Sequence, residues 1–258
     1  MMAYMAAPIT DIDSMPRGGP DASCLDRLLQ TDRPQYLDRD SDGDAANEAR
    51  KRSVIRALEW TGEFFGNTER FARIVLDEVA DVPDPKILEL GSGHGGLSRK
   101  LLEWHPTAEV TVTDVESQSV KAIEAGDLGA HARATVRVMD ATAIDSPDGH
   151  FDLAVFTLSF HHLPPSLASR VFAEGTRVAA KLVIIDLPRP PSLLHIVRLA
   201  AMLPLAPVIP FVHDGVISSL RCYSPSALRA LAAHADPAIE VEMRGGLMNP
   251  QVVVASSG

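Results

Sequence analysis

Cysteine is almost absent from this chain. Its 258 residues include two, Cys24 and Cys222, which lie far apart and in no spacing typical of zinc ligands or redox pairs. The sequence therefore predicts neither a disulfide framework nor a metal site. Such sparse cysteine usage favours a reducing, cytoplasmic location.

Basic residues are also in short supply. The 24 Lys and Arg residues are outnumbered by 34 Asp and Glu residues, which gives a formal net charge of -10. Proteins that bind nucleic acid neutralise its phosphates with clustered Lys and Arg. We therefore expect no nucleic acid as substrate or partner.

The chain lacks an uninterrupted apolar run that could cross a bilayer. Residues 1–15 have neither the basic start nor the apolar core of a secretory signal. The longest apolar stretch, residues 193–212, contains His195 and Arg198 and is interrupted by three prolines, which a membrane-spanning helix tolerates poorly. We expect this stretch to form a lid or a pocket wall, with no integral membrane segment.

The length and composition predict one main domain. A chain of 258 residues, 46% of them hydrophobic, can bury one substantial core but not two ordinary domains. Residues 1–44 are rich in Asp, Pro, Gly and Ser, so we expect a flexible tail with one short amphipathic stretch near Leu25. Residues 45–258 would form the domain, and residues 193–223 an insertion that forms a lid or part of an acceptor pocket.

The order of the predicted elements is typical of an α/β protein. Two helices, 45–65 and one beginning near 67, come first, and after Lys86 short apolar runs alternate with helical segments, as in a parallel sheet with crossover helices. A last helix begins at the N-cap Ser224. The expected strands are 87–90, 110–113, 135–139, 153–157, 182–186, 239–243 and 251–255, and the expected crossover helices are 95–104, 117–125 and 166–179.

The most informative segment is residues 87–98, Ile-Leu-Glu-Leu-Gly-Ser-Gly-His-Gly-Gly-Leu-Ser, where an apolar strand meets a glycine-rich turn. Glycines at 91, 93 and 95 permit positive φ and carry no side chain. A ligand can therefore lie against the backbone, with its anionic end at the N–H groups of the next helix. An ordinary strand-to-helix turn is the alternative, but four glycines within six residues favour a nucleotide-like ligand.

The glycines alone leave two ligand classes open. Gly91, Gly93 and Gly96 also satisfy the G-x-G-x-x-G fingerprint of dinucleotide-binding proteins. Asp114, which ends the second strand, could accept hydrogen bonds from both hydroxyls of a ribose. Both classes use such an acid, so Asp114 indicates a ribose and no particular cofactor.

A family resemblance separates the two classes. Glu89-Leu-Gly-Ser-Gly-His-Gly95, Asp114 and Met139-Asp-Ala141 closely resemble motifs of the class I S-adenosylmethionine-dependent methyltransferases, over roughly residues 86–186. The resemblance implies a doubly wound, seven-stranded, mostly parallel sheet with helices on both faces and a reversed strand at the C-terminus. The N-terminal helices and the insertion would be additions to that fold.

The resemblance also implies a cofactor role for particular residues. Glu89 would lie near the sulfonium and amino end of S-adenosyl-L-methionine, and Asp114 would hold its ribose. Asp140 would accept a hydrogen bond from the adenine amino group, while the backbone of Ala141 would approach the ring. The further cofactor-contacting positions expected are Gly91, Ser92, Gly93 and Gly95 in the turn, Val115 after Asp114, and Thr157 at the end of the fourth strand.

The carboxylates make physical sense for this cofactor. Its sulfonium and ammonium groups are positive, so nearby acids favour it, whereas they would repel the pyrophosphate of a dinucleotide. Glu89 therefore argues against a nicotinamide cofactor. Asp140 has an alternative role as a residue that caps the turn after its strand.

The fourth strand ends at a histidine pair, His161 and His162, followed by two prolines. The resembled family places residues flanking the transferred methyl and the acceptor here, and its quinone-biosynthesis members show a similar pair. A histidine at this place could remove a proton from the acceptor. The alternative is structural: one ring packs in the core or caps the following helix.

The acceptor pocket is expected outside the sheet. The family often builds it from a helix before the first strand, here carrying Trp60, Phe64 and Phe65, and from an insertion such as residues 193–212. An apolar lining selects an apolar acceptor. Plain core packing is the alternative for these aromatic residues, and the polar residues between His213 and Tyr223 receive no definite role.

The sequence thus predicts methyl transfer from S-adenosyl-L-methionine to a small, largely apolar molecule. One alternative is a NAD-dependent oxidoreductase on a Rossmann fold. Another is a protein that binds the cofactor without turnover. The identity of the acceptor, the atom methylated and the oligomeric state stay open, with a homodimer as one option.

Overall fold

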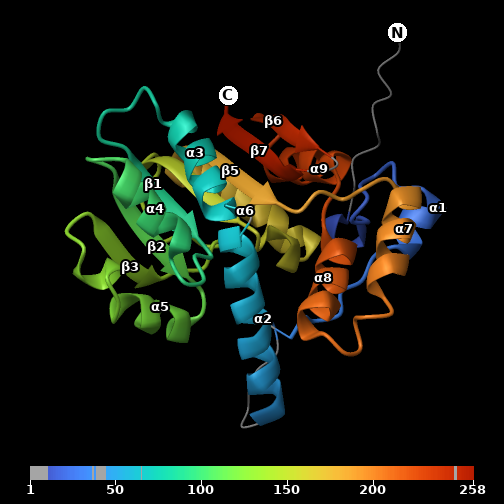
Figure 1. The fold of residues 1–258 in the computed structure, drawn as a ribbon. Coiled ribbons are helices and arrows are strands. Elements are labelled where there is room, and N and C mark those ends of the chain that lie inside the picture. The colour runs from blue at the N-terminus through green and yellow to red at the C-terminus, as the bar shows by residue number, and fades with distance from the viewer. Residues whose placement is uncertain (1–10, 37, 39–44, 65, 247–248) are drawn as a thin grey trace.

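A computed structural model describes residues 11–36, 38, 45–64, 66–246 and 249–258, with the side chains of 45, 48 and 58–64 left out. Its centre is a seven-stranded sheet in the order β3-β2-β1-β4-β5-β7-β6 (Figure 1). Strands β1 to β5 are parallel, and β7 runs antiparallel to both β5 and β6. The predicted fold is therefore confirmed. The strands are β1 (Lys86–Leu90), β2 (Glu109–Asp114), β3 (Ala134–Val138), β4 (Phe151–Thr157), β5 (Ala179–Asp186), β6 (Ile239–Gly246) and β7 (Asn249–Ser257).

Helices cover both faces of the sheet. One face packs against α6 (Pro165–Val178) and α9 (Pro225–Ala235), and the other against α3 (Asn67–Glu78) and α4 (Gly96–Trp104). Helix α5 (Ser117–Glu124) follows β2. The central strands are apolar on both sides because both of their faces are buried.

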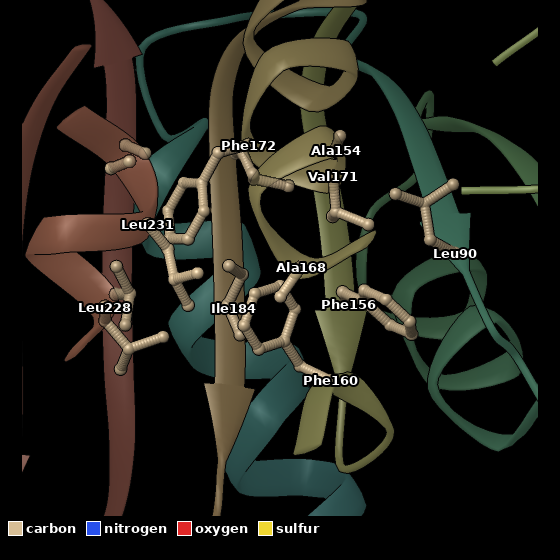
Figure 2. Packing of buried hydrophobic residues seen from close by; sticks show 14 of the residues in the cluster. Leu90, Ala154, Phe156, Phe160, Ala168, Val171, Phe172, Ile184, Leu228 and Leu231 are labelled. Atoms are coloured by element: carbon tan, nitrogen blue, oxygen red, sulfur yellow. The ribbon is translucent and has the colours of Figure 1, made fainter. Parts of the chain in front are cut away.

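The core beneath α6 and α9 is built from aromatic and branched side chains. Phe156 of β4 and Ile184 of β5 pack beneath Phe172 of α6 and Leu228 of α9, and Phe160 fills the space between them (Figure 2). The Phe160 ring meets those of Phe156 and Phe172 edge on, at centroid distances of 6.0 and 5.7 Å. This packing holds the end of β4, and so the histidine pair that follows it.

The insertion is a helical hairpin, α7 (Ser192–Met202) and α8 (Pro210–Arg221), which lies beside the sheet together with α2 (Ala45–Phe64) (Figure 1). Prolines at 204, 207 and 210 explain the break between the two helices, since proline cannot donate the next helical hydrogen bond. None of the described helices is long and apolar enough to span a bilayer.

The N-terminal segment differs from the expectation of a loose tail. Residues 11–36 include a 3-10 turn (Ile12–Ser14) and α1 (Cys24–Leu28), and Ile12 and Met15 are buried in the core. Arg17 is also buried, and its guanidinium lies 2.8 to 3.2 Å from the carbonyl oxygens of His161, Leu163 and Arg221. Composition predicts disorder because it does not register contacts with residues so distant in sequence.

Candidate functional site

The glycine turn joins β1 to α4 at the carboxyl edge of the sheet. Gly91, Gly93 and Gly95 all have positive φ, between 56 and 73°. A Cβ on Gly91 would lie 2.6 Å from the Phe156 ring, whereas a Cβ on Gly93 would meet nothing within 4 Å. Packing therefore excludes a side chain at Gly91, while the backbone at Gly93 faces open space that a ligand could occupy.

Asp114 connects this turn to the end of β2. One of its oxygens accepts the Gly93 N–H at 2.9 Å, and the other accepts the Glu116 N–H at 2.9 Å. The backbone N–H of Ser92 donates to the Thr113 carbonyl, also at 2.9 Å. The structure thus brings together Asp114 and the turn, as the sequence predicted.

Glu89 lies in β1 directly beneath the turn and is 1% exposed. The backbone N–H of Ser98, on α4, donates to its carboxylate at 3.1 Å, and the Ser98 hydroxyl donates to the same oxygen. Burial raises the pKa of Glu89 to about 7, and the negative charge of Asp114 adds to that rise. A cation bound nearby would therefore favour the ionised form.

The residues after β3 lie next to this cluster but make a local turn. The Met139 N–H donates to the Asp114 carbonyl at 3.0 Å. Asp140 is exposed, and one of its oxygens accepts the backbone N–H and the hydroxyl of Thr142, each at 2.8 Å. The structure thus shows the turn-capping role of Asp140. Its neighbour Ala141 packs against the core.

The end of β4 has unusual backbone geometry. Leu158 has a φ of 53° and is the one non-glycine residue with positive φ in the part of the chain that the structure describes. Such a conformation is strained for a branched side chain, and it commonly marks functional sites. Leu158 follows the half-buried Thr157 and precedes the histidine pair.

Val115, the residue directly after β2, is 69% exposed.

His161 is buried against the end of the neighbouring strand β5. Its Nδ1 lies 2.8 Å from one oxygen of Asp186, and its backbone N–H donates to the other oxygen at 2.8 Å. Its Nε2 is buried and has no hydrogen-bond partner. Buried polar atoms are rarely left unpaired, so this nitrogen is a candidate for contact with a bound molecule.

His162 contacts segments that are distant in sequence. Its Nδ1 lies 2.6 Å from Asp38, which also pairs with Arg221 of α8 at 2.6 Å. Burial alone would raise the pKa of Asp38, but the hydrogen bond with His162 and the charge of Arg221 hold that pKa well below its usual range. The two histidine rings lie 4.4 Å apart between centroids.

A cavity of about 380 Å³ lies away from this cluster. It is lined by the loop from Pro188 to Pro191, by Ser224 and by residues of β6 and β7. It sits at the β5–β7 side of the sheet, whereas the glycine turn lies between β1 and β2. The cavity is therefore not the predicted cofactor site.

Three comparisons with known proteins agree. Residues 87–181 match the family model described as a methyltransferase domain. The chain is 34% identical over 112 residues to the malonyl-[acyl-carrier protein] O-methyltransferase of Geobacter sulfurreducens. This match covers 43% of this chain and only 40% of that relative. It is 25% identical over 193 residues to the demethylmenaquinone methyltransferase of Thermus thermophilus, covering 69% of this chain and 86% of that relative.

A solved structure shares the fold. It is a SAM-dependent methyltransferase from Aquifex aeolicus, with a TM-score of 0.52 and 19% identity, and the match covers 72% of this chain and 89% of that one. The chain is thus similar to S-adenosylmethionine-dependent methyltransferases in sequence over residues 87–181 and in fold. These comparisons favour S-adenosyl-L-methionine over a nicotinamide cofactor.

Some residues of the candidate site were not predicted from the sequence. Asp186, Asp38 and Arg17 each contact the histidine pair or its carbonyl oxygens, yet none was singled out. One signal was available for Asp186: it ends a predicted buried strand at the edge where Asp114 also lies. Asp38 and Arg17 sit in the predicted tail, and nothing local marks them.

The predicted acceptor pocket is described only in part. The side chains of Trp60, Phe64 and Phe65 lie outside the described residues. The polar residues before Tyr223 hold the N-terminal segment: buried Asp214 accepts the Tyr36 N–H at 2.9 Å, and Gln35 donates to the Ser218 hydroxyl at 2.6 Å. These contacts give that cluster a structural role.

Proposed function

We propose that this methyltransferase transfers the methyl group of S-adenosyl-L-methionine to a small, largely apolar acceptor. The open backbone at Gly93, next to the carboxylates of Glu89 and Asp114, supports binding of a cationic adenosyl compound. One of the relatives is a demethylmenaquinone methyltransferase, a name that supports an apolar acceptor here too.

The described residues fit the cofactor. Glu89 would face its positive end, and Gly91, Ser92, Gly93 and Gly95 would line its methionyl part. Asp114 and Val115 would lie at the ribose. Asp140 and Ala141 would lie at the adenine. One oxygen of the Asp140 carboxylate accepts from Thr142, and the other oxygen would accept a hydrogen bond from the adenine amino group. Thr157 would contact the cofactor from the end of β4.

The histidine pair supplies the base in this proposal. When bound, the cofactor offers an electrophilic methyl on a sulfonium. Nε2 of His161 would accept the proton that leaves the acceptor, and the electron pair freed on the acceptor would then be available to the methyl group. Nδ1 of His161 donates to Asp186, which fixes the tautomer that leaves Nε2 free to accept. His162 would orient the acceptor beside it.

The proposal rests on the buried, unpartnered Nε2 of His161 at the carboxyl edge of the sheet. We expect His161→Ala to lower kcat by about a hundredfold or more, while S-adenosylhomocysteine binds with unchanged affinity. Asp186→Asn should lower kcat less than His161→Ala does and leave KM nearly unchanged. Asp186→Glu should restore part of the lost kcat. The exposed His234→Ala serves as the control.

The measurement combines calorimetry with a transfer assay. S-adenosylhomocysteine is titrated into the full chain, and label from methyl-labelled S-adenosylmethionine is followed into a panel of reduced quinones and acyl thioesters. Absence of binding at high micromolar concentration would remove the cofactor assignment. Tight binding without label in any acceptor would instead indicate a protein that binds the cofactor without turnover. Full activity in His161→Ala would refute the assignment of the base.

A further inference from the structure

The α7–α8 hairpin presents a surface unlike the rest of this acidic protein. Every exposed residue from 191 to 209 is Pro, Leu, Ile, Val or Ala. Leu193, Val197 and Val208 are 76, 64 and 79% exposed. Single exposed apolar residues are ordinary on a protein surface, but a contiguous patch marks an interaction site.

The polar residues of the same stretch point elsewhere. Ser192 donates to Asp26 of α1 at 2.7 Å, and buried His195 lies 2.9 Å from the Ser219 hydroxyl of α8. Burial and the charge of Arg189 lower the pKa of His195 to about 4, so its ring is uncharged at neutral pH. The half-buried Arg198 is then the one charged side chain from 190 to 212. The hairpin is thus amphipathic, with its apolar side outward.

The backbone at the tip of the hairpin offers no free donors. Residues 204, 207 and 210 are prolines and have no N–H. The N–H groups of 203, 205, 206, 208 and 209 all donate to carbonyl oxygens between 199 and 205, at 2.8 to 3.1 Å. The tip therefore has no N–H group left to donate a hydrogen bond to water or to a polar partner. A shallow position at a lipid surface suits such a backbone, because an unpaired N–H is costly in lipid, whereas the carbonyl oxygens of the tip can stay at the level of the headgroups and in contact with water.

Charge is consistent with a lipid surface. The chain has 34 acidic residues, yet none lies between 187 and 213. An acid there would resist transfer from water to a bilayer, whereas Arg198 can place its guanidinium among phosphates while its stem stays apolar. Protein interfaces, by comparison, generally carry hydrogen bonds distributed over the contact. A tip whose N–H groups are paired and whose exposed side chains are apolar therefore fits lipid better than a protein partner.

We propose that the α7–α8 hairpin docks this protein onto a lipid bilayer by shallow insertion of its tip, from Leu203 to Ile209, with the exposed side of α7 lying in the interface. The base of the hairpin reaches the site, because Arg221 at the end of α8 donates to the His162 carbonyl. An apolar acceptor dissolved in the bilayer would thus be near the site. Docking itself depends neither on the cofactor nor on the proposed reaction.

Flotation with vesicles of phosphatidylcholine tests the proposal on the full chain, without cofactor or acceptor. We expect the protein to float with the vesicles, and binding to persist at high salt because the contact is apolar. The double substitution Val197→Asp and Val208→Asp should reduce the bound fraction at least about tenfold, since carboxylates resist burial in lipid. The matched control is Val138→Asp on β3, a 54% exposed valine at the opposite end of the sheet (Figure 1).

A second variant provides a readout that does not depend on weakened binding. Val208→Trp should retain binding, and its emission should shift to shorter wavelength and be quenched by brominated acyl chains. No flotation of the wild-type protein, equal flotation of the aspartate variant, or an unquenched tryptophan would each overturn the proposal. A stable dimer that does not bind vesicles and that dissociates in the aspartate variant would also overturn the proposal, because the patch would then be an interface between two copies.

Discussion

At the scale of single residues, Glu89 is the group of the proposed cofactor site whose pKa is raised by burial. It is fully buried, and its pKa of about 7 compares with 4.5 in the unfolded chain. The folded state therefore holds a proton that the unfolded state has lost between these two pH values, so stability falls as pH rises from about 4.5 to 7. The difference corresponds to roughly 3 kcal/mol.

Glu89→Gln should remove this dependence. We expect urea denaturation of the ligand-free wild type to give a free energy of unfolding that declines from pH 5 to pH 8 relative to the variant. Binding has the opposite sign: S-adenosylhomocysteine carries an ammonium, so its affinity should rise over the same range in the wild type and stay flat in Glu89→Gln. Parallel stability curves for the two proteins would show that the carboxyl titrates elsewhere.

At the scale of elements, the N-terminal segment, residues 11–36, is fixed next to the histidine pair. Arg17 fixes it, since its guanidinium contacts three carbonyl oxygens and lies 4.4 Å from the centre of the Tyr223 ring. Its ion pair with Asp32 adds little, because Asp32 is exposed. We expect Arg17→Ala to lower the free energy of unfolding by roughly 2 to 4 kcal/mol, since buried carbonyls lose a charged donor.

Limited proteolysis and urea denaturation can check the role of Arg17 together. In Arg17→Ala, cleavage within residues 11–36 should become faster than in the wild type, while Arg17→Lys should lie between the two. The exposed Arg27, which donates to the Ala22 carbonyl at 3.3 Å, supplies the control Arg27→Ala. Equal effects at 17 and 27 would mean that the segment is held by its apolar residues alone.

The same scale shows why the sequence predicted some features and not others. Strands, crossover helices and the glycine turn follow from local patterns. Four of the proposed cofactor-binding residues, Gly91, Ser92, Gly93 and Gly95, lie within that one turn. The His161–Asp186 pair spans 25 residues, and the His162–Asp38 pair spans 124. Neither leaves a periodic signature, because each contact exists only once the sheet has formed. Asp140 shows the reverse case: its sequence pattern fits two roles, and the structure displays the local one.

At the scale of the whole molecule, the proposed cofactor site joins the ends of separate strands, so a ligand there should stabilise the entire domain. The Asp114 carboxylate accepts the N–H groups of Gly93 in one loop and of Glu116 in the next, and the parallel strands β2, β1 and β4 lie side by side and end at this edge of the sheet. A ligand that binds only the folded state stabilises it by about 2.7 kcal/mol at a hundred times its Kd. Saturating S-adenosylhomocysteine should therefore raise the Tm of the single unfolding transition by several degrees, roughly 2 to 4 °C for each 1 kcal/mol in a domain of this size.

Asp114→Ala separates this global effect from nonspecific stabilisation. The variant should unfold in one transition but show little or no rise in Tm with the ligand, because the ribose loses its acceptor and the two loops lose their link. Asp81→Ala, which removes an exposed carboxylate in the turn after α3, should retain the full rise. If Asp114→Ala gained as much as the wild type, the ligand would bind elsewhere, and the edge shared by β1, β2 and β4 would not be where this protein holds its cofactor.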